Sequence, residues 1–582
     1  MLTQRSSQLS MYQADVEYLD RVGRDSFFGQ VAQARARLFR DEDFAALYCP
    51  DNGRPAVPPS LLAVALLLQA HDKVSDVEAI ERANFDVRWC VALGIEIASR
   101  PFVKSTLQLF RSQLVIHERA GAVFLASLEE AKRKGFLRGK KRTLAVDTTP
   151  IFGKGAVLDT YNLLATGIVQ LARALAAGVG EKPEVFAAAH ELSLYFGTSL
   201  KAQAAINWDK KAEREALLRG IVSDAQRLLE LAREVRASLP AKAAEAEAIH
   251  QSAELLCQLL VQDIGGLDGD EPQLKDGVSR DRMPSATDPD MRHGRKSKCN
   301  RFDGHKAAVA VDTGSGLITN ADVIAGNAPD NENALDLVTG TEDNTGCEIG
   351  KTLGDCAYGD GATRQKFAEA ERELVARMAG RPEGQLSKDE FDIDLEGDCV
   401  TCPGGHTVQG SKARKRGDQE ARMFQFPAAV CAACPVREQC VKGKGGRRVT
   451  IHPQEALLQA ARAYQATDEF REDVIKRQVV EHRIARLVQL GIRQSRFLGR
   501  KKTRFQLLMA SAVANLTLIW GGSVPADGEA PAAGQTDTSN AALAFSSSLR
   551  RAIRSSLGAI RGFLNASRSP TPRCRRAVAA GC

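Results

Sequence analysis

Two short apolar runs in this chain each end in an aspartate, and this pattern restricts the fold more than any other feature. The runs are TLAVD, which ends at Asp147, and TLGD, which ends at Asp355. A buried charge without a partner is costly, so each carboxylate must be solvated where its strand leaves a sheet or must hold a ligand. A third acidic residue, Glu481, lies within EDVIKRQVVEHRIARLVQLG, a basic and apolar segment with helical spacing.

The order of the expected elements predicts an α/β protein that is interrupted by insertions. Residues 165–260 are rich in alanine and leucine and predict helices, and a polar stretch after them predicts a long loop. The runs HKAAVAVD and GLITNADVI predict two strands joined by the glycine-containing turn TGSG. We expect a helix after them, begun by Asp330 or Asn331.

Residues 1–135 predict a bundle of helices. The segment PSLLAVALLLQAHD is apolar on all sides, as a buried helix would be, and Ser75 and Glu78 have the spacing of a capping box. Lys and Arg on the outer faces suit a helix-turn-helix-like module that binds DNA, but the same periodicity fits any helical bundle.

The hydropathy pattern argues against a membrane protein. The longest apolar run, LLAVALLLQA at 61–70, is about half of the ~20 residues needed to cross a bilayer. The first residues lack the apolar region of a signal peptide. We therefore expect a cytoplasmic protein, and a chain of 582 residues predicts two to four structural units.

Positive charge is concentrated toward the end of the chain. Residues 471–504 contain 11 Lys and Arg against 3 Asp and Glu, and residues 541–582 contain 8 Arg and no acidic residue, although the net charge of the chain is only +7. Such clustering suits a polyanion such as DNA, because phosphates supply most of the non-specific affinity. The alternative is that these charges serve solubility alone.

The cysteines predict a second kind of site. Cys402, Cys431, Cys434 and Cys440 have the spacing C-x28-C-x2-C-x5-C, and Cys399 could replace Cys440. In a chain without a secretion signal, such a cluster is more often a metal site than a set of disulfides. Four thiolates around Zn²⁺ would form a closed structural site that staples a segment without its own core. The alternative is a group of reduced thiols without a metal.

The three acidic residues predict a site for hard divalent cations. Carboxylates that converge from separate elements repel one another unless a cation lies among them, and Mg²⁺ prefers oxygen ligands. Two such ions can activate a water or a 3′-hydroxyl and stabilise the leaving oxygen of a phosphodiester. Acidic residues also cap helices and form turns, so spacing alone does not establish the site. Asp360, in a glycine-rich turn, is an alternative to Asp355 as the second ligand.

Several ordered blocks carry a family resemblance. They are LAVDTTP, SATDPDMRHGRKSKCNRFDGHKAAVAVD, ITNADVIAGNAPDNENALDLV, TLGDCAYGD and RQVVEHRIARL, preceded by GRPAVPPSLLAVALLLQAHDKVSDVEAIERANFDVRWCVALG. In this order the blocks resemble prokaryotic insertion-sequence transposases of the DDE superfamily, and they are most similar to insertion-sequence family eleven-eighty-two. The resemblance covers residues 40–520.

The resemblance implies an RNase H-like catalytic core. It implies a helical N-terminal DNA-binding domain at 1–135 and a DDE catalytic domain at 136–522. The catalytic domain would carry a helical and loop insertion at 161–285 and a Cys-rich insertion at 385–450. Outside the resemblance, the composition rich in Gly, Ala, Ser and Pro past Trp520 predicts a flexible linker and basic tail at 523–582, and the alternative for its last part is a basic amphipathic helix. The family's catalytic, metal-binding triad maps to Asp147, Asp355 and Glu481, which would hold Mg²⁺ or Mn²⁺.

One superfamily signature matches only in part. The spacing Arg477-x-x-x-Glu481 agrees with it, but Val474 and Val488 stand where the signature has a tyrosine and a lysine. The departures leave open which side chains contact a DNA end. We expect basic residues on this helix and before the hairpin to contact DNA: Arg292, Arg295, Lys296, Lys306, Arg477, Arg483 and Arg486. His305 is more consistent with a strand residue than with a catalytic one.

We therefore expect a DNA transposase that cleaves the ends of its element and joins the freed 3′-hydroxyls to target DNA. Its partners would be double-stranded DNA and a second copy of the chain, as family behaviour suggests, and its location would be the cytoplasm, in association with the nucleoid. One alternative is a transposon-derived DNA-binding protein whose catalysis has lapsed. Another is a structural zinc-ribbon protein whose acidic residues are incidental.

Overall fold

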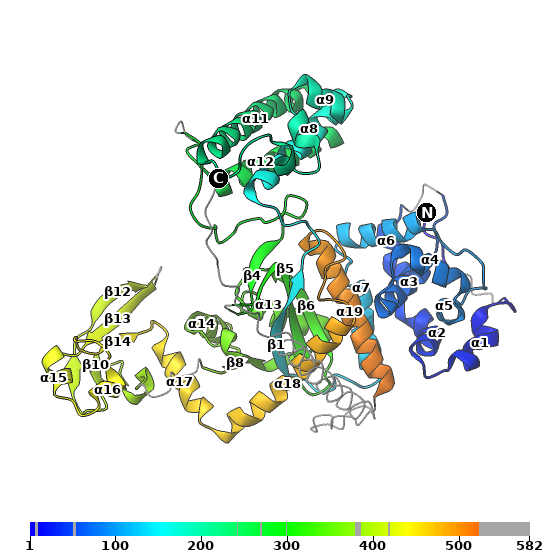
Figure 1. Ribbon diagram of the computed structural model, residues 1–582. Helices are drawn as coiled ribbons and strands as arrows, with labels where there is room; N and C mark the ends of the chain where they lie inside the picture. Colours follow the sequence, from blue (N-terminus) through cyan, green and yellow to red (C-terminus); the bar gives the residue numbers. More distant parts are fainter. Residues whose placement is uncertain are drawn as a thin grey trace, which may run out of the picture. The chain divides into compact units, whose positions relative to one another are not determined.

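The structure is a computed structural model of the 582-residue chain (Figure 1). It describes residues 1–5, 10–49, 54–240, 243–267, 271–297, 299–378, 386–416 and 419–522. The predicted linker and basic tail, residues 523–582, lies outside the described residues.

A mixed six-stranded sheet forms the centre of the protein. Its strands are β1 (Lys141–Phe152), β4 (Arg292–Arg295), β5 (Arg301–Asp312), β6 (Ile318–Ala325), β7 (Glu348–Gly354) and β8 (Glu373–Ala376). The order is β4-β5-β1-β7-β8, and β6 also pairs with β5. β5 runs antiparallel to β1 and β6, whereas β7 and β8 run parallel to β1. Parallel neighbours bring the same end of β1 and β7 to one edge of the sheet.

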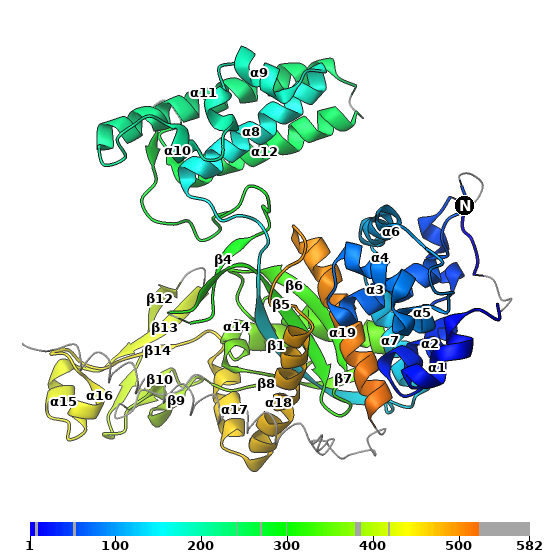
Figure 2. The same ribbon diagram turned by 45° about the vertical axis from the view of Figure 1, so that its right-hand side comes forward.

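Alternating side chains of β1 and β5 pack against two different layers. Leu144 and Val146 face α13 (Ala334–Thr345) and α14 (Gly361–Glu369) in one core. Ala145 and Ile151 face the opposite layer, whose core contains residues of α18 (Asp468–Gln489) and α19 (Arg500–Gly521). Because side chains alternate along a strand, both faces of the sheet are apolar and both are covered by helices (Figure 2).

Seven α-helices and a 3₁₀ turn among the described residues precede the sheet. They are α1 (Ala14–Val22), α2 (Phe27–Leu38), η1 (Asp41–Leu47), α3 (Pro59–Asp72), α4 (Asp76–Phe85), α5 (Val87–Leu93), α6 (Lys104–Ile116) and α7 (Ala122–Arg133). Helix α3 is buried almost throughout, as its composition predicts. The hydroxyl of Ser75 accepts the N–H of Glu78 at 3.2 Å and caps α4. The core of these helices continues into α19.

A second group of helices lies in the chain between β1 and β4. It consists of α8 (Thr160–Val179), α9 (Pro183–Ala189), η2 (Ser193–Phe196), α10 (Leu200–Gln203), α11 (Lys211–Ser238) and α12 (Ala244–Asp263), followed by β2 (Ile264–Gly265) and β3 (Gln273–Leu274). These helices share a separate core. Among the described residues, α8 is the one helix long and apolar enough to cross a membrane, and half of its apolar window is buried in this core.

A small β-rich segment precedes the last helices. It contains η4 (Lys388–Glu390), β9 (Asp392–Asp394), β10 (Cys399–Thr401), β11 (Thr407–Gln409), β12 (Lys412–Arg416), β13 (Gln419–Gln425), α15 (Ala428–Ala432), α16 (Arg437–Cys440) and β14 (Arg448–Ile451). Phe424, Phe426 and Val449 are buried in its compact core. Helix α17 (Glu455–Gln465) then leads to α18.

Candidate active site

Asp147 lies in the middle of β1. The prediction that its strand ends there is wrong, because β1 continues to Phe152 and Asp147 pairs with Val309 of β5. Its side chain is about 20% exposed. Burial raises the pKa of Asp147 to about 6, and the charges of Asp355 and Asp330 act in the same direction. The N–H of Thr148, 2.7 Å from Oδ1, and the Arg477 guanidinium oppose this rise in pKa.

Asp355 directly follows β7, as predicted. It caps the short 3₁₀ turn η3 (Cys356–Tyr358), where its Oδ1 accepts the N–H of Ala357 at 2.8 Å. β7 is the parallel neighbour of β1, which explains why the charge of Asp355 reaches Asp147. Asp355 and Arg477 line one cavity of about 180 Å³. The first two predicted acidic residues therefore face the same part of the sheet.

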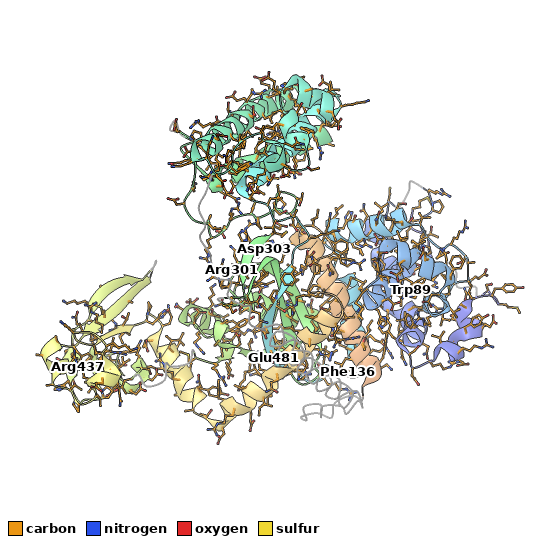
Figure 3. The ribbon with its side chains drawn as sticks, in the orientation of Figure 1. Trp89, Phe136, Arg301, Asp303, Arg437 and Glu481 are labelled. Atoms are coloured by element: carbon orange, nitrogen blue, oxygen red, sulfur yellow. The ribbon has the colours of Figure 1, made fainter. Side chains whose placement is uncertain are left out.

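Glu481 reaches this region from α18 (Figure 3). Its side chain is 56% exposed, and its carboxylate accepts a hydrogen bond from Nη2 of Arg477, one helical turn earlier. Nη1 of the same arginine lies 3.5 Å from Oδ2 of Asp147 and has no hydrogen-bond partner among the described residues. Arg477 therefore connects the third acidic residue to the first.

The donor set has the chemistry of a divalent-cation site. Asp147 and Asp355 offer hard oxygen ligands, and their mutual repulsion favours a cation between them. Within the part of the chain that the structure describes, no group of three or more His, Cys, Asp or Glu side chains is spaced to hold a metal ion. In this conformation the Arg477 guanidinium lies between Asp147 and Glu481 and supplies the positive charge that a bound cation would supply there.

The sequence did not single out Asp330 as a site residue. The helix predicted to begin there starts instead at Ala334, after the N-cap residue Asn333. Oδ1 of Asp330 accepts hydrogen bonds from the hydroxyl of Thr148 at 2.7 Å and from Nζ of Lys306 at 2.8 Å. A lysine within the apolar run HKAAVAVD was a usable signal, because a buried ammonium requires an acidic partner.

The residues predicted to contact DNA differ in their exposure. Arg295 and Lys296 are exposed at the end of β4, whereas Arg292 is half-buried and donates to the carbonyl oxygens of Pro289 and Met291. Lys306 is 8% exposed and is bonded to Asp330, so its ammonium is not presented to solvent. Arg483 and Arg486 are half-buried on α18, near Arg477 in sequence.

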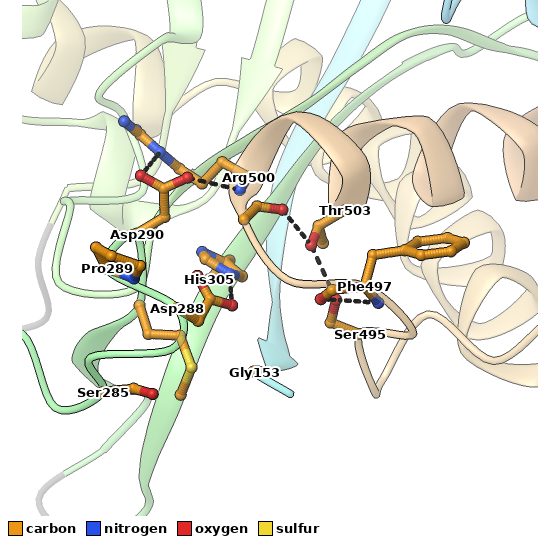
Figure 4. A network of polar contacts seen from close by, with 12 residues as sticks. Gly153, Ser285, Asp288, Pro289, Asp290, His305, Ser495, Phe497, Arg500 and Thr503 are labelled. Atoms are coloured by element: carbon orange, nitrogen blue, oxygen red, sulfur yellow. Dashed lines mark hydrogen bonds and ion pairs between the residues drawn. The ribbon is translucent and has the colours of Figure 1, made fainter. Parts of the chain in front are cut away.

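His305 lies within a buried junction. Its Nε2 is 3.7 Å from Oδ2 of Asp288, and both side chains are fully buried (Figure 4). In the same loop, Oδ2 of Asp290 accepts the N–H of Arg500 at 2.8 Å, at the start of α19. Asp360 caps α14, accepting the N–H groups of Ala362 and Thr363. The environments of His305 and Asp360 therefore agree with structural roles.

The predicted zinc ligands line one cavity of the β-rich segment. They are Cys402, Cys431, Cys434 and Cys440, together with His406, and Cys399 is absent from this lining. Even so, no group of three or more His, Cys, Asp or Glu side chains among the described residues is spaced to hold a metal ion. The structure therefore does not support the zinc prediction, although it brings together the four cysteines that the spacing selected.

Three family models match the sequence. A transposase domain model (DUF772) matches residues 16–113, and two models described as transposase DDE domains match residues 276–430 and 401–520. A search of curated proteins finds no match. The matched ranges include Asp355 and Glu481, while Asp147 lies outside them. The mixed α/β architecture with its helical N-terminal region fits an RNase H-like core.

Proposed function

We propose that this chain is an insertion-sequence transposase of the DDE type, which cleaves the ends of its element and joins the 3′-hydroxyls to target DNA. The matches to transposase DDE domains support a metal-dependent enzyme that acts on DNA. The observation that supports the proposed chemistry is the position of Asp147 on β1 and of Asp355 directly after its parallel neighbour β7, with Arg477 between Asp147 and Glu481.

Asp147, Asp355 and Glu481 would hold Mg²⁺ or Mn²⁺, which when bound supplies activation of the attacking hydroxyl and stabilises the leaving oxygen. Asp147 must be ionised to act as a ligand. Because its pKa is raised to about 6, its carboxyl group is mostly ionised only above about pH 6. Arg477 would have to move away from Asp147 and Glu481 when the cation binds, because the guanidinium and the cation would occupy the same place between these two carboxylates. Its guanidinium would then be available to a DNA phosphate.

Basic side chains around this region would bind double-stranded DNA. Arg295, the last residue of β4, and Lys296 after it are exposed, and Arg483 and Arg486 lie on the helix that carries Glu481. Phosphate contacts of this kind fix the position of a duplex without reading its sequence. We further propose that two copies of the chain bind two element ends, and that the protein acts in the cytoplasm at the nucleoid.

The alternative of a catalytically lapsed DNA-binding protein is not favoured, since the DDE matches cover the second and third acidic residues. Cleavage of DNA that carries the inverted ends flanking this gene tests the proposal directly. We expect strand cleavage that requires Mg²⁺ or Mn²⁺ and stops with EDTA. Binding of this DNA without metal-dependent cleavage would contradict the enzymatic proposal and favour the lapsed form.

A further inference from the structure

Asp330 and Lys306 form a charged pair immediately beside the candidate active site. Nζ of Lys306 donates to Oδ1 of Asp330 at 2.8 Å and to the carbonyl oxygen of Ala328 at 2.6 Å. Lys306 is 8% exposed, so its charge has little access to water. A buried ammonium is tolerated only when its partner is well placed, and removal of either member leaves the other charge uncompensated.

The pair is tied to β1 next to Asp147. The hydroxyl of Thr148 donates to the same Oδ1 of Asp330 at 2.7 Å. In the ladder between β1 and β5, Thr148 pairs with Ala308 and Pro150 pairs with Lys306, so Thr148 and Lys306 share one face of the sheet. Successive side chains alternate between faces, which places Asp147 on the other one. Asp330 therefore acts on Asp147 across the strand and not as a ligand beside it.

A buried tyrosine packs on the face of β1 that carries Thr148, in the core that contains Leu144 and Val146. Tyr358 is fully buried, and its hydroxyl has no hydrogen-bond partner among the described residues. Burial raises the pKa of Tyr358, and the charges of Asp147, Asp330 and Asp355 raise it further. The charges of all three carboxylates therefore act in the same direction on the pKa of Tyr358.

We propose that Asp330 and Lys306 are positioning residues that set the charge around Asp147 and thereby the affinity of the active site for a divalent cation. The inference rests on the proposed function, because it concerns the cation that this function requires. The negative charge of Asp330 attracts the cation and the positive charge of Lys306 repels it. In the intact pair these two effects on the cation largely cancel.

The charge model predicts opposite effects for the two single variants. With Lys306 left uncompensated, Asp330→Asn should weaken Mn²⁺ binding by about three- to tenfold. With Asp330 left uncompensated, Lys306→Met should tighten Mn²⁺ binding by a similar factor. The double variant should return close to the affinity of the unmodified protein. A purely structural role would instead weaken binding in both single variants.

The measurement is calorimetric titration of the full chain with Mn²⁺ alone, without DNA, with thermal melting to confirm that each variant folds. Asp322→Asn is the matched control, since it also removes a carboxylate that is paired with a cation: Asp322 of β6 lies 2.8 Å from Arg504 of α19. Asp330→Glu, which keeps the charge, should stay closer to the unmodified affinity than Asp330→Asn. If Lys306→Met does not fold, the contrast between Asp330→Glu and Asp330→Asn decides.

The outcomes separate this inference from the proposed function. If the unmodified chain binds Mn²⁺ and Asp147→Asn abolishes this binding, the proposed active site stands. The positioning role alone would then be overturned if Asp330→Asn left the affinity unchanged, or if both single variants weakened it. Absence of Mn²⁺ binding by the unmodified chain would instead count against the proposed active site. Opposite shifts with recovery in the double variant would support the pair as the residues that set cation affinity.

Discussion

The guanidinium of Arg477 lies 3.5 Å from the carboxylate of Asp147 while it also binds Glu481. One cationic side chain therefore satisfies two of the three acidic residues that would hold a metal ion. This relationship implies competition between Arg477 and the cation, and it suggests that a DNA phosphate which attracts Arg477 would favour metal binding.

Replacement of Arg477 should reveal this competition. Without DNA, Arg477→Met should bind Mn²⁺ about fivefold more tightly than the unmodified chain, because a competing positive charge is gone. The same variant should cleave DNA poorly if Arg477 holds the substrate. Calorimetric titration gives the affinity, and Arg483→Met, which removes a charge from the same helix, serves as the control. Equal affinity in all three proteins would argue against competition.

Replacing any one of the three acidic residues should impair DNA cleavage while leaving DNA binding largely unchanged. Asp147→Asn, Asp355→Asn and Glu481→Gln should each reduce strand cleavage by at least about a thousandfold, because each removes a metal ligand. Binding of element-end DNA, measured by gel shift, should change little. Asp360→Asn is the control, since Asp360 caps α14; it should keep cleavage and lose at most about 1 kcal/mol of stability. Near-normal cleavage by a triad variant would remove that residue from the site.

The raised pKa of Asp147 predicts a pH-dependent cost to stability. Its pKa is about 6 in the folded protein and about 4 in an unfolded chain, so the folded state binds the proton more tightly. Stability should therefore fall as pH rises from about 4 through 6. In EDTA, Asp147→Asn should be more stable than the unmodified chain by on the order of 2 kcal/mol at pH 8 and equal to it near pH 4. Denaturant melts at several pH values measure this difference, and a constant difference would contradict the assignment.

Gly304 should tolerate no side chain. Its φ is 151°, and a Cβ there would lie 2.2 Å from the carbonyl oxygen of Ile151 and 2.4 Å from the nitrogen of Gly153. Gly304→Ala should destabilise the protein by more than about 2 kcal/mol, because the atoms that it meets are backbone. Gly220→Ala is the matched control. Gly220 lies within α11 with open space around it, so the change should stabilise by about 0.5 to 1 kcal/mol. Comparable melting temperatures for the two variants would refute the steric argument.

The spacing of apolar residues predicted the helices and strands of the active site better than it predicted which distant strands and side chains pair with them. The strand ending at Asp355, the helix carrying Glu481 and the buried helix α3 follow from apolar spacing. The end of β1 does not, because Pro150 lacks an N–H and usually argues against a strand interior. In the structure β1 continues since it pairs with β5, which lies more than a hundred residues later.

Long-range pairing also explains the site residues that the sequence missed. Lys306 was predicted to contact DNA, yet its partner Asp330 lies in a segment whose composition indicates only a turn and the start of a helix. No local pattern specifies that these two side chains meet beside Thr148. The cysteines show the reverse case, in which spacing correctly groups four residues around one cavity but does not determine whether they bind a metal.

The helices between β1 and β4 leave and rejoin the sheet at adjacent points. Phe152, the last residue of β1, pairs with Gly304 of β5, and Gly304 pairs with Arg292 at the start of β4. β1 and β4 run parallel to each other on opposite sides of β5, so residues 153–291 form a crossover connection whose two ends are fixed beside Gly304, whatever its length. Segments of other sizes could be exchanged at this junction during evolution or by design without changing the register of the strand that carries Asp147.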